Sequence, residues 1–234
     1  MNIIVTGASR GIGYETVKAL SLNPENYIVA VSRNLKKLKD LVRECFEINR
    51  HSRVIPLVFD LNSSNFQDYF IPQVLQYIDS VDVLINNAGH LINKPVQDCT
   101  NEEFDHIFNV NIKAVFNLIK HLYPHFSTNA HILNLSSMGG FQGSVKFPGL
   151  ALYSASKGAL AVFTECLAEE FREENIKANC LALGSVQTEM LSEAFPGYEA
   201  PLSASKAAEF ISQFALTGHH FFNGKVLPMS ITTP

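Results

Sequence analysis

The chain has 234 residues, of which 47% are hydrophobic and 17% charged, and its formal net charge at pH 7 is -4. These values are typical of an ordinary globular protein, and they argue against nucleic acid or an anionic membrane as a partner. Four scattered cysteines without a CxxC pair indicate reduced thiols, and the first residues predict a strand rather than a charged leader. No apolar run approaches the ~20 residues that a membrane span needs. We therefore expect a cytoplasmic protein.

Short β-branched segments alternate with longer amphipathic segments along the whole chain. Seven segments are predicted strands, and most are apolar at successive positions, as strands covered on both faces are. They are residues 2–6, 27–32, 53–59, 81–86, 131–136, 177–183 and 225–229. Between them, apolar residues recur at helical spacing, as at Phe108, Ile112 and Val115. This alternation predicts a single-domain α/β fold over residues 1–234, a Rossmann-like doubly wound parallel sheet with helices on both faces.

The first predicted strand runs into a glycine-rich turn, TGASRGIG, that precedes an amphipathic helix. Its glycines are Gly7, Gly11 and Gly13, in a GxxxGxG spacing. Glycines let a backbone turn tightly and approach a pyrophosphate, which then lies at the N-terminus of the helix. The same pattern also fits a simple strand-to-helix turn, but its place after the first strand favours a dinucleotide site.

Tyr153 and Lys157 lie four residues apart in the predicted helix LYSASKGAL, with only small residues between them. Residues one helical turn apart project from the same face. They could be the polar edge of an amphipathic helix, or an acid–base pair. A phenol has a pKa near ~10, and a nearby opposite charge lowers a pKa by about 1–3 units. We therefore expect Lys157 to lower the pKa of Tyr153.

Residues 184–205 form the one long segment without clear periodicity. The segment follows the sixth predicted strand, at the edge where open α/β sheets bind their ligands. A long loop inside a compact domain is more often functional than accidental. We therefore expect residues 185–205 to act as a lid over a substrate.

Five motifs in sequence order resemble those of the short-chain dehydrogenases/reductases. They are TGASRGIG at 6–13, NNAG at 86–89, NVN ending at Asn111, NLSS ending at Ser137 and YSASK at 153–157. The later IKANCLALGSVQT, 176–188, resembles the sixth strand and following loop of the family, so that the resemblance covers nearly the whole chain. It implies an oxidoreductase that transfers a hydride between a nicotinamide cofactor and a carbonyl/alcohol pair.

The resemblance also implies roles for particular residues. Asn111, Ser137, Tyr153 and Lys157 would form the catalytic tetrad. Tyr153 would exchange a proton with the substrate oxygen, Ser137 would hydrogen-bond that oxygen, and Lys157 would bind the nicotinamide ribose. Asn111 would hold a water that relays protons. The implied cofactor contacts are Gly7, Ser9, Arg10, Gly11, Ile12, Gly13, Arg33, Asn34, Asp60, Leu61, Asn87, Ala88, Gly89, Tyr153, Lys157, Val186 and Thr188.

The end of the second predicted strand bears on the choice of cofactor. NAD-preferring relatives place an acidic residue there, which accepts the ribose 2′-hydroxyl. This chain has Ser32, Arg33 and Asn34 instead, and Arg10 adds a second cation. Guanidinium groups bind a phosphate through paired hydrogen bonds, so NADP(H) is the expected cofactor and NAD(H) the alternative. The other interpretation is that both arginines are solvated surface charges.

Several further residues fit simple structural roles as well as functional ones. His121 with His125, and His219 with His220, have no third ligand at a motif position, so no metal site is predicted. Six residues either line an apolar pocket or pack the lid against the domain: Phe141, Phe147, Met190, Leu191, Phe195 and Tyr198. The segment from Ser137 to Tyr153 is longer than is usual in the family, with VKFPGLAL as the extra length.

The resemblance implies a small-molecule carbonyl or alcohol substrate and a homodimer or homotetramer. By resemblance, one set of apolar residues belongs to helices that pair across the dimer interface of the family, although a helical apolar stripe is more often part of a core: Leu118, Phe126, Leu160, Val162, Phe163 and Leu167. Two rival functions stay open. One is a 3-oxoacyl-thioester reductase of the fatty-acid type, and the other is a cofactor-sensing binding protein that carries out no chemistry.

Overall fold

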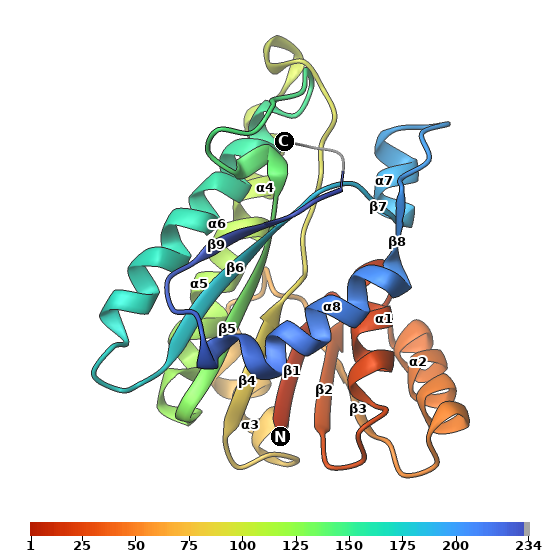
Figure 1. Ribbon diagram of the computed structural model, residues 1–234, viewed down its shortest axis with the longest axis vertical. Coiled ribbons are helices and arrows are strands. Elements are labelled where there is room, and N and C mark those ends of the chain that lie inside the picture. The colour runs from red at the N-terminus through yellow and green to blue at the C-terminus, as the bar shows by residue number, and fades with distance from the viewer. Residues whose placement is uncertain (232–234) are drawn as a thin grey trace.

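Seven parallel strands form the central sheet of the computed structural model, which describes residues 1–231 (Figure 1). They are β1 (Asn2–Thr6), β2 (Tyr27–Ser32), β3 (Arg53–Val58), β4 (Val81–Asn86), β5 (Phe126–Ser137), β6 (Lys177–Leu183) and β9 (Val226–Met229). Their order across the sheet is β3-β2-β1-β4-β5-β6-β9. This is a Rossmann-like order, in which ligands bind at the carboxyl ends of the strands beside β1 and β4. The predicted fold class is confirmed; residues 232–234 of the predicted domain lie outside the described residues.

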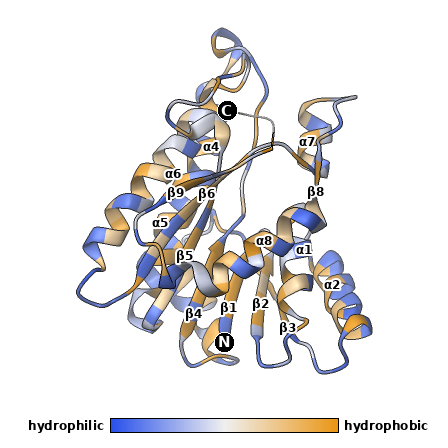
Figure 2. Cartoon of the chain, viewed as in Figure 1, coloured by the Kyte–Doolittle hydropathy of each residue, from blue (hydrophilic) through white to orange (hydrophobic). Residues whose placement is uncertain are grey.

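Helices cover both faces of this sheet. They are α1 (Gly11–Leu20), α2 (Leu35–Ile48), α3 (Ile71–Leu75), α4 (Asn101–Phe108), α5 (Ala114–Leu122), α6 (Ala151–Glu170), α7 (Glu189–Ala194) and α8 (Ala204–Thr217). Successive strand residues enter opposite cores: Ile3 packs with residues of α1, α2 and α8, and Ile4 packs with residues of α3, α5 and α6. Figure 2 shows the hydrophobic strands between helices whose outer faces are hydrophilic.

The segment expected to be a long loop contains regular structure. β7 (Val186–Gln187) and β8 (Leu202–Ser203) pair in parallel, and the short helix α7 lies between them. Thr188 caps α7 by accepting a hydrogen bond from the Leu191 amide, with a distance of 3.2 Å between Oγ1 and N. Elements this short show no periodicity in a sequence, which is why pattern analysis finds only a loop here.

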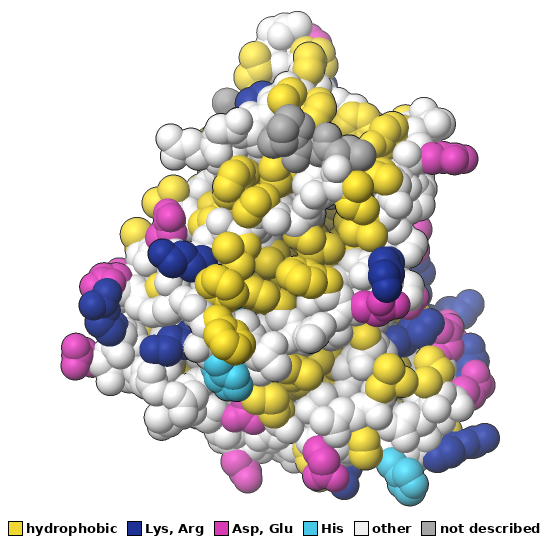
Figure 3. All heavy atoms as spheres, viewed as in Figure 1, with side chains coloured by type: hydrophobic (Ala, Val, Ile, Leu, Met, Phe, Trp, Pro, Cys, Tyr) yellow, Lys and Arg dark blue, Asp and Glu magenta, His cyan; other side chains and the backbone are white. Residues whose placement is uncertain are grey.

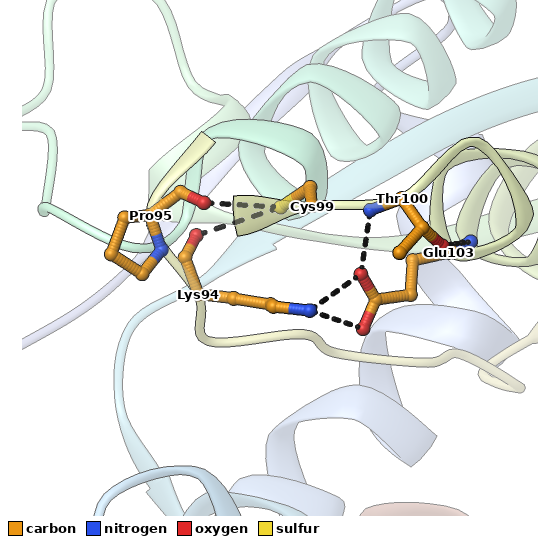
Figure 4. Close-up of polar contacts among 5 residues, drawn as sticks. All are labelled: Lys94, Pro95, Cys99, Thr100 and Glu103. Atoms are coloured by element: carbon orange, nitrogen blue, oxygen red, sulfur yellow. Dashed lines mark hydrogen bonds and ion pairs between the residues drawn. The ribbon is translucent and has the colours of Figure 1, made fainter. Parts of the chain in front are cut away.

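A network of polar contacts fixes the start of α4 (Figure 4). Thr100 and Glu103 form a capping box, in which Oγ1 of Thr100 accepts from the Glu103 amide and the Thr100 amide donates 2.8 Å to Oε2 of Glu103. Nζ of Lys94 lies 3.0 Å from both carboxylate oxygens of Glu103, and Sγ of Cys99 lies 3.4 Å from the Pro95 carbonyl oxygen. These contacts tie the loop before α4, which borders the site described below, to the body of the domain.

The residues expected at a dimer interface differ in their exposure to solvent. Figure 3 shows hydrophobic side chains over β9 and α8 on the face that it presents. Of the residues expected at a dimer interface, Leu118, Leu160 and Leu167 are buried in the core of the domain instead, and Phe126 begins β5 rather than lying on a helix. Val162 is exposed. The homo-oligomer stays a prediction, and the burial of Leu118, Leu160 and Leu167 agrees with the alternative that this apolar stripe belongs to the core.

Residues 1–231 contain neither a helix that could span a membrane nor a cluster of metal-binding side chains. Within these described residues, no helix is long and apolar enough to cross a membrane, and no three His, Cys, Asp or Glu side chains gather in a way that could hold a metal ion. His121 stacks on Phe66, with ring centroids 5.4 Å apart, and His219 packs against His131. All four cysteines are free thiols.

Candidate active site

The turn after β1 is built for close backbone packing. Gly7 and Gly11 have φ values of +67° and +56°, which glycine adopts without strain. Nδ2 of Asn87 donates to the carbonyl oxygens of Thr6 and Gly7, at 2.9 and 3.2 Å. In return, Oγ1 of Thr6 accepts from the amides of Asn87 and Ala88, each at 3.1 Å. The end of β4 therefore locks the glycine turn in place, and two motifs far apart in the sequence form one unit.

A cavity of about 660 Å³ opens over this turn, at the carboxyl ends of the strands. Most of the predicted cofactor contacts line it: Gly7, Ser9, Arg10, Gly11, Ile12, Arg33, Asp60, Leu61, Asn87, Ala88, Gly89, Tyr153, Lys157 and Thr188. Three do not. Gly13 lies beneath the turn, Asn34 caps α2 by accepting from the Lys37 amide, and Val186 lines the neighbouring cavity described below.

The residues of this cavity fit a dinucleotide. A Cβ on Gly13 would lie 2.3 Å from Nδ2 of Asn87 and 2.6 Å from the carbonyl oxygen of Gly7, so the turn closes only around a glycine. The turn leads directly into α1, whose N-terminus presents free amides to an anion. β2 ends at Ser32 and is followed by the exposed Arg33, with no carboxylate at that point. The shape of the turn is compatible with the phosphate site that the glycine spacing predicts, and the site stays a prediction.

The four predicted catalytic residues come together at one side of this cavity. Tyr153 and Lys157 lie one turn apart on α6, and Nζ of Lys157 is 6.0 Å from the centre of the Tyr153 ring. Ser137 ends β5, and its hydroxyl is near enough to the Tyr153 phenol to lower the pKa of that phenol. Asn111 is fully buried, donates to the carbonyl oxygen of His90 and to Oγ of Ser156, each at 2.9 Å, and accepts from the His90 amide at 2.8 Å.

The electrostatics of the pair on α6 differ from the expectation. Burial raises the pKa of Tyr153 to about 12, and the hydrogen bond with Ser137 only partly opposes this rise. Burial lowers the pKa of Lys157 to about 8, and its Nζ donates 2.8 Å to the Leu135 carbonyl oxygen rather than to the phenol. Desolvation therefore outweighs the attraction between the two groups. Tyr153 is a protonated phenol at neutral pH in this state, which suits a proton donor.

A second cavity, of about 410 Å³, lies against Ser137 and Tyr153. Tyr153, Thr188 and Met190 line both cavities, so the two spaces meet at the phenol. Phe141, one of the six residues expected at an apolar pocket, does not line this cavity. The other five do: Phe147, Met190, Leu191, Phe195 and Tyr198. Within the described residues, every side chain that lines the cavity is uncharged.

The unusually long segment before α6 borders this second cavity. Phe147 and Leu150 contribute side chains to its wall. The carbonyl oxygen of Gly149, a residue with a φ of +82°, accepts from the Lys94 amide at 2.8 Å. The inserted residues are therefore held against the loop before α4, which is itself tied to α4 (Figure 4). The insertion therefore forms part of the wall of the second cavity.

Comparison with known proteins agrees with this geometry. A family model described as short chain dehydrogenase matches residues 1–199. The chain belongs to the short-chain dehydrogenase/reductase family. It is therefore an oxidoreductase.

Three similar proteins illustrate the range of this family. The Sus scrofa protein carbonyl reductase (NADPH) 2 is 34% identical over 193 residues, which cover 81% of this chain and 73% of that protein. A dehydrogenase/reductase from Sinorhizobium meliloti has a solved structure with a TM-score of 0.86 and 25% identity, covering 98% of this chain and 93% of that one. The 3-ketoacyl-(acyl-carrier-protein) reductase of Brucella melitensis, solved with NADH, has a TM-score of 0.84 and 25% identity, with coverages of 98% and 96%.

The structure adds four titratable residues to the first cavity of this short-chain dehydrogenase/reductase. His90, His106, Glu189 and Glu193 line it, and none of them belongs to a motif that points to a cofactor. The rings of His90 and His106 meet edge to face with centroids 4.6 Å apart, and burial is the largest effect that lowers the pKa of His90. His90 directly follows the NNAG motif, so its position near the cofactor cavity could have been predicted from the sequence. The other three residues have no such neighbouring motif.

Proposed function

We propose that this enzyme reduces an uncharged, apolar carbonyl compound with NADP(H), with Tyr153 as the proton donor. The observation that carries the proposal is the position of the Ser137–Tyr153 pair, where a cavity with a phosphate-binding turn meets a cavity without charged side chains. The two spaces have the chemistry that a dinucleotide and an apolar ketone would need.

Each residue of the tetrad has its own role in the proposed reaction. When bound, the nicotinamide cofactor supplies the hydride. Ser137 hydrogen-bonds the carbonyl oxygen and stabilises the negative charge that develops on it. Tyr153, whose pKa burial raises to about 12, holds its proton at neutral pH and gives it to that oxygen. Lys157 binds the ribose hydroxyls of the cofactor, and Asn111, held by its three hydrogen bonds, orients the water that returns the proton.

The preference for NADP(H) over NAD(H) is supported by charge. Arg10 and Arg33 line the cavity, and two guanidinium groups would bind an adenosine 2′-phosphate. Within residues 1–231, Arg33 takes part in no ion pair, so its charge is available to a ligand. The similar protein of Sus scrofa is named a carbonyl reductase (NADPH), which supports the same assignment.

The class of substrate follows from the walls of the second cavity. Hydrophobic side chains from the insertion and from residues 185–205, the lid, surround the hydroxyls of Ser137 and Tyr153. An ionised group buried there would have no partner, and burying an unpaired charge is costly. The lid segment also carries Glu189, Glu193 and Glu199 and no basic residue, which disfavours an acidic carrier protein as the substrate carrier. We therefore place a free ketone or aldehyde ahead of a carrier-bound 3-oxoacyl thioester.

A matched pair of ketones tests the substrate class. We expect acetophenone to be reduced with a kcat/KM at least about 10-fold higher than 4-carboxyacetophenone, because the carboxylate would enter a wall without a counter-charge. NADPH consumption is measured with each ketone and with a 3-oxoacyl N-acetylcysteamine thioester. The Leu191→Arg variant, which adds a cation to the wall, should narrow the difference between the two ketones. Equal rates with both ketones in the wild-type enzyme would contradict the proposed substrate class.

A further inference from the structure

Helix α7 meets the glycine turn through a direct ion pair. Nη1 of Arg10 lies 2.6 Å from Oε1 of Glu193, although the two residues are 183 positions apart in the sequence. Arg10 is the residue that precedes α1 in the glycine turn, and Glu193 lies on α7 within the lid. The proposed contact of Arg10 with a 2′-phosphate and this observed contact with a carboxylate use the same guanidinium group.

A second carboxylate of α7 lies over the same turn. Oε2 of Glu189 would be 3.6 Å from a Cβ on Gly11, and Cγ2 of Thr188 would be 3.2 Å from it. Both Glu189 and Glu193 line the cavity that the cofactor would enter. The far end of α7 is also tied down, because Nδ2 of Asn93 donates 2.8 Å to the carbonyl oxygen of Ala194. A short acidic helix is therefore held across the phosphate-binding turn.

We propose that Glu193 is a cofactor-selectivity residue, which occupies Arg10 in the cofactor-free enzyme and competes with an adenosine 2′-phosphate for its guanidinium group. The inference rests on the proposed NADP(H) function. A ligand with a 2′-phosphate has to break the Arg10–Glu193 pair or accept a carboxylate beside it, and a ligand with a 2′-hydroxyl does not. Glu193 therefore weakens the binding of NADP(H) relative to NAD(H). Replacing Glu193 with an uncharged residue should increase the preference of the enzyme for NADP(H). Glu189 lies beside Gly11 and forms no ion pair with Arg10 within the described residues, so we expect its charge to affect both cofactors equally.

The expected effect of Glu193 on the binding of a 2′-phosphate is small because the side chains of the Arg10–Glu193 pair are exposed to solvent. The side chains of Arg10 and Glu193 are 39% and 63% exposed. An exposed pair of this kind contributes little, and double-mutant measurements on similar pairs correspond to about two- to five-fold in an equilibrium constant. Salt screens such a pair, so the effect should shrink when the ionic strength is raised from about 0.01 M to about 1 M.

Binding of adenosine 2′,5′-bisphosphate and of AMP, measured by calorimetry, isolates the 2′-phosphate. We expect Glu193→Gln to tighten the bisphosphate about two- to five-fold and to leave AMP unchanged. Glu189→Gln should tighten both ligands alike. Glu199→Gln removes the same charge from an exposed lid residue that does not line the cavity, and it serves as the control.

The outcomes separate the inference from the proposed function. If the wild-type enzyme binds neither the bisphosphate nor NADPH, the proposed function itself is wrong. If it binds NADPH but Glu193→Gln changes the ratio of the two dissociation constants no more than Glu199→Gln does, the inference alone is overturned. The inference is also overturned if Glu193→Gln weakens the bisphosphate, because the carboxylate would then help to hold Arg10 for the ligand.

Discussion

Replacing Tyr153 by phenylalanine removes the turnover of the enzyme and leaves its binding of NADPH within about two-fold of the wild type. The substitution deletes one oxygen atom, the one that Ser137 contacts and that lies where the two cavities meet. Loss of a positioned general acid costs about 10²–10⁴-fold in rate. The ring itself stays, so the walls of both cavities keep their shape. The rate is measured as NADPH oxidation with an uncharged ketone, and the dissociation constant by fluorescence titration of NADPH.

Tyr123→Phe is the matched control for this experiment. Tyr123 lies outside both cavities, and its hydroxyl donates 2.7 Å to Oε1 of Glu174 on the exposed surface. The control should keep the wild-type rate. If Tyr153→Phe retained a tenth of the wild-type rate or more, another group would have to supply the proton, and the assignment of Tyr153 would be wrong.

Replacing Gly13 by alanine should cost both stability and cofactor binding. The added Cβ would lie 2.6 Å from the carbonyl oxygen of Gly7 and 2.3 Å from Nδ2 of Asn87, so the turn or the end of β4 has to move. Forcing an extra methyl group into a packed site costs about 1–3 kcal/mol in the free energy of unfolding. Because the same atoms shape the phosphate cradle, we expect NADPH to bind at least about 10-fold more weakly.

Gly158→Ala provides the comparison for this variant. Gly158 also lies inside a helix, but a Cβ there would be 3.4 Å from the nearest atom, the carbonyl oxygen of Gly140. Alanine is favoured over glycine in a helix by about 1 kcal/mol, so this variant should be as stable as the wild type or slightly more stable. Urea unfolding measures both variants. Equal stability of Gly13→Ala and Gly158→Ala would contradict the close packing of the glycine turn.

The fold could be predicted from the sequence because its signals are local. Each buried strand is a short apolar run, and the turn after β1 carries its own glycines, so the elements and their alternation need no knowledge of long-range contacts. The ordered motifs predict that Asn111, Ser137, Tyr153 and Lys157 share one site. In the structure the four residues lie close together. These four roles stay a proposal until they are tested by substitution.

Two features could not be predicted because they depend on the packed structure. The pKa of Tyr153 is set mainly by burial, and burial is a property of the whole domain rather than of the spacing to Lys157. The Arg10–Glu193 pair joins the first turn to a helix of six residues near the other end of the chain. Neither residue lies in a pattern that would pair them, and α7 is too short to show one.

The central claim is that a hydride passes from the cofactor to a carbonyl carbon in the second cavity. Its most direct test uses NADPH that carries deuterium at both C4 positions of the nicotinamide, together with an uncharged ketone such as acetophenone. We expect the alcohol product to contain one deuterium atom, bound to the carbinol carbon, and we expect Tyr153→Phe to form almost none of this product. Tight binding of NADPH without deuterium transfer to any carbonyl compound would contradict the account and favour a protein that senses the cofactor.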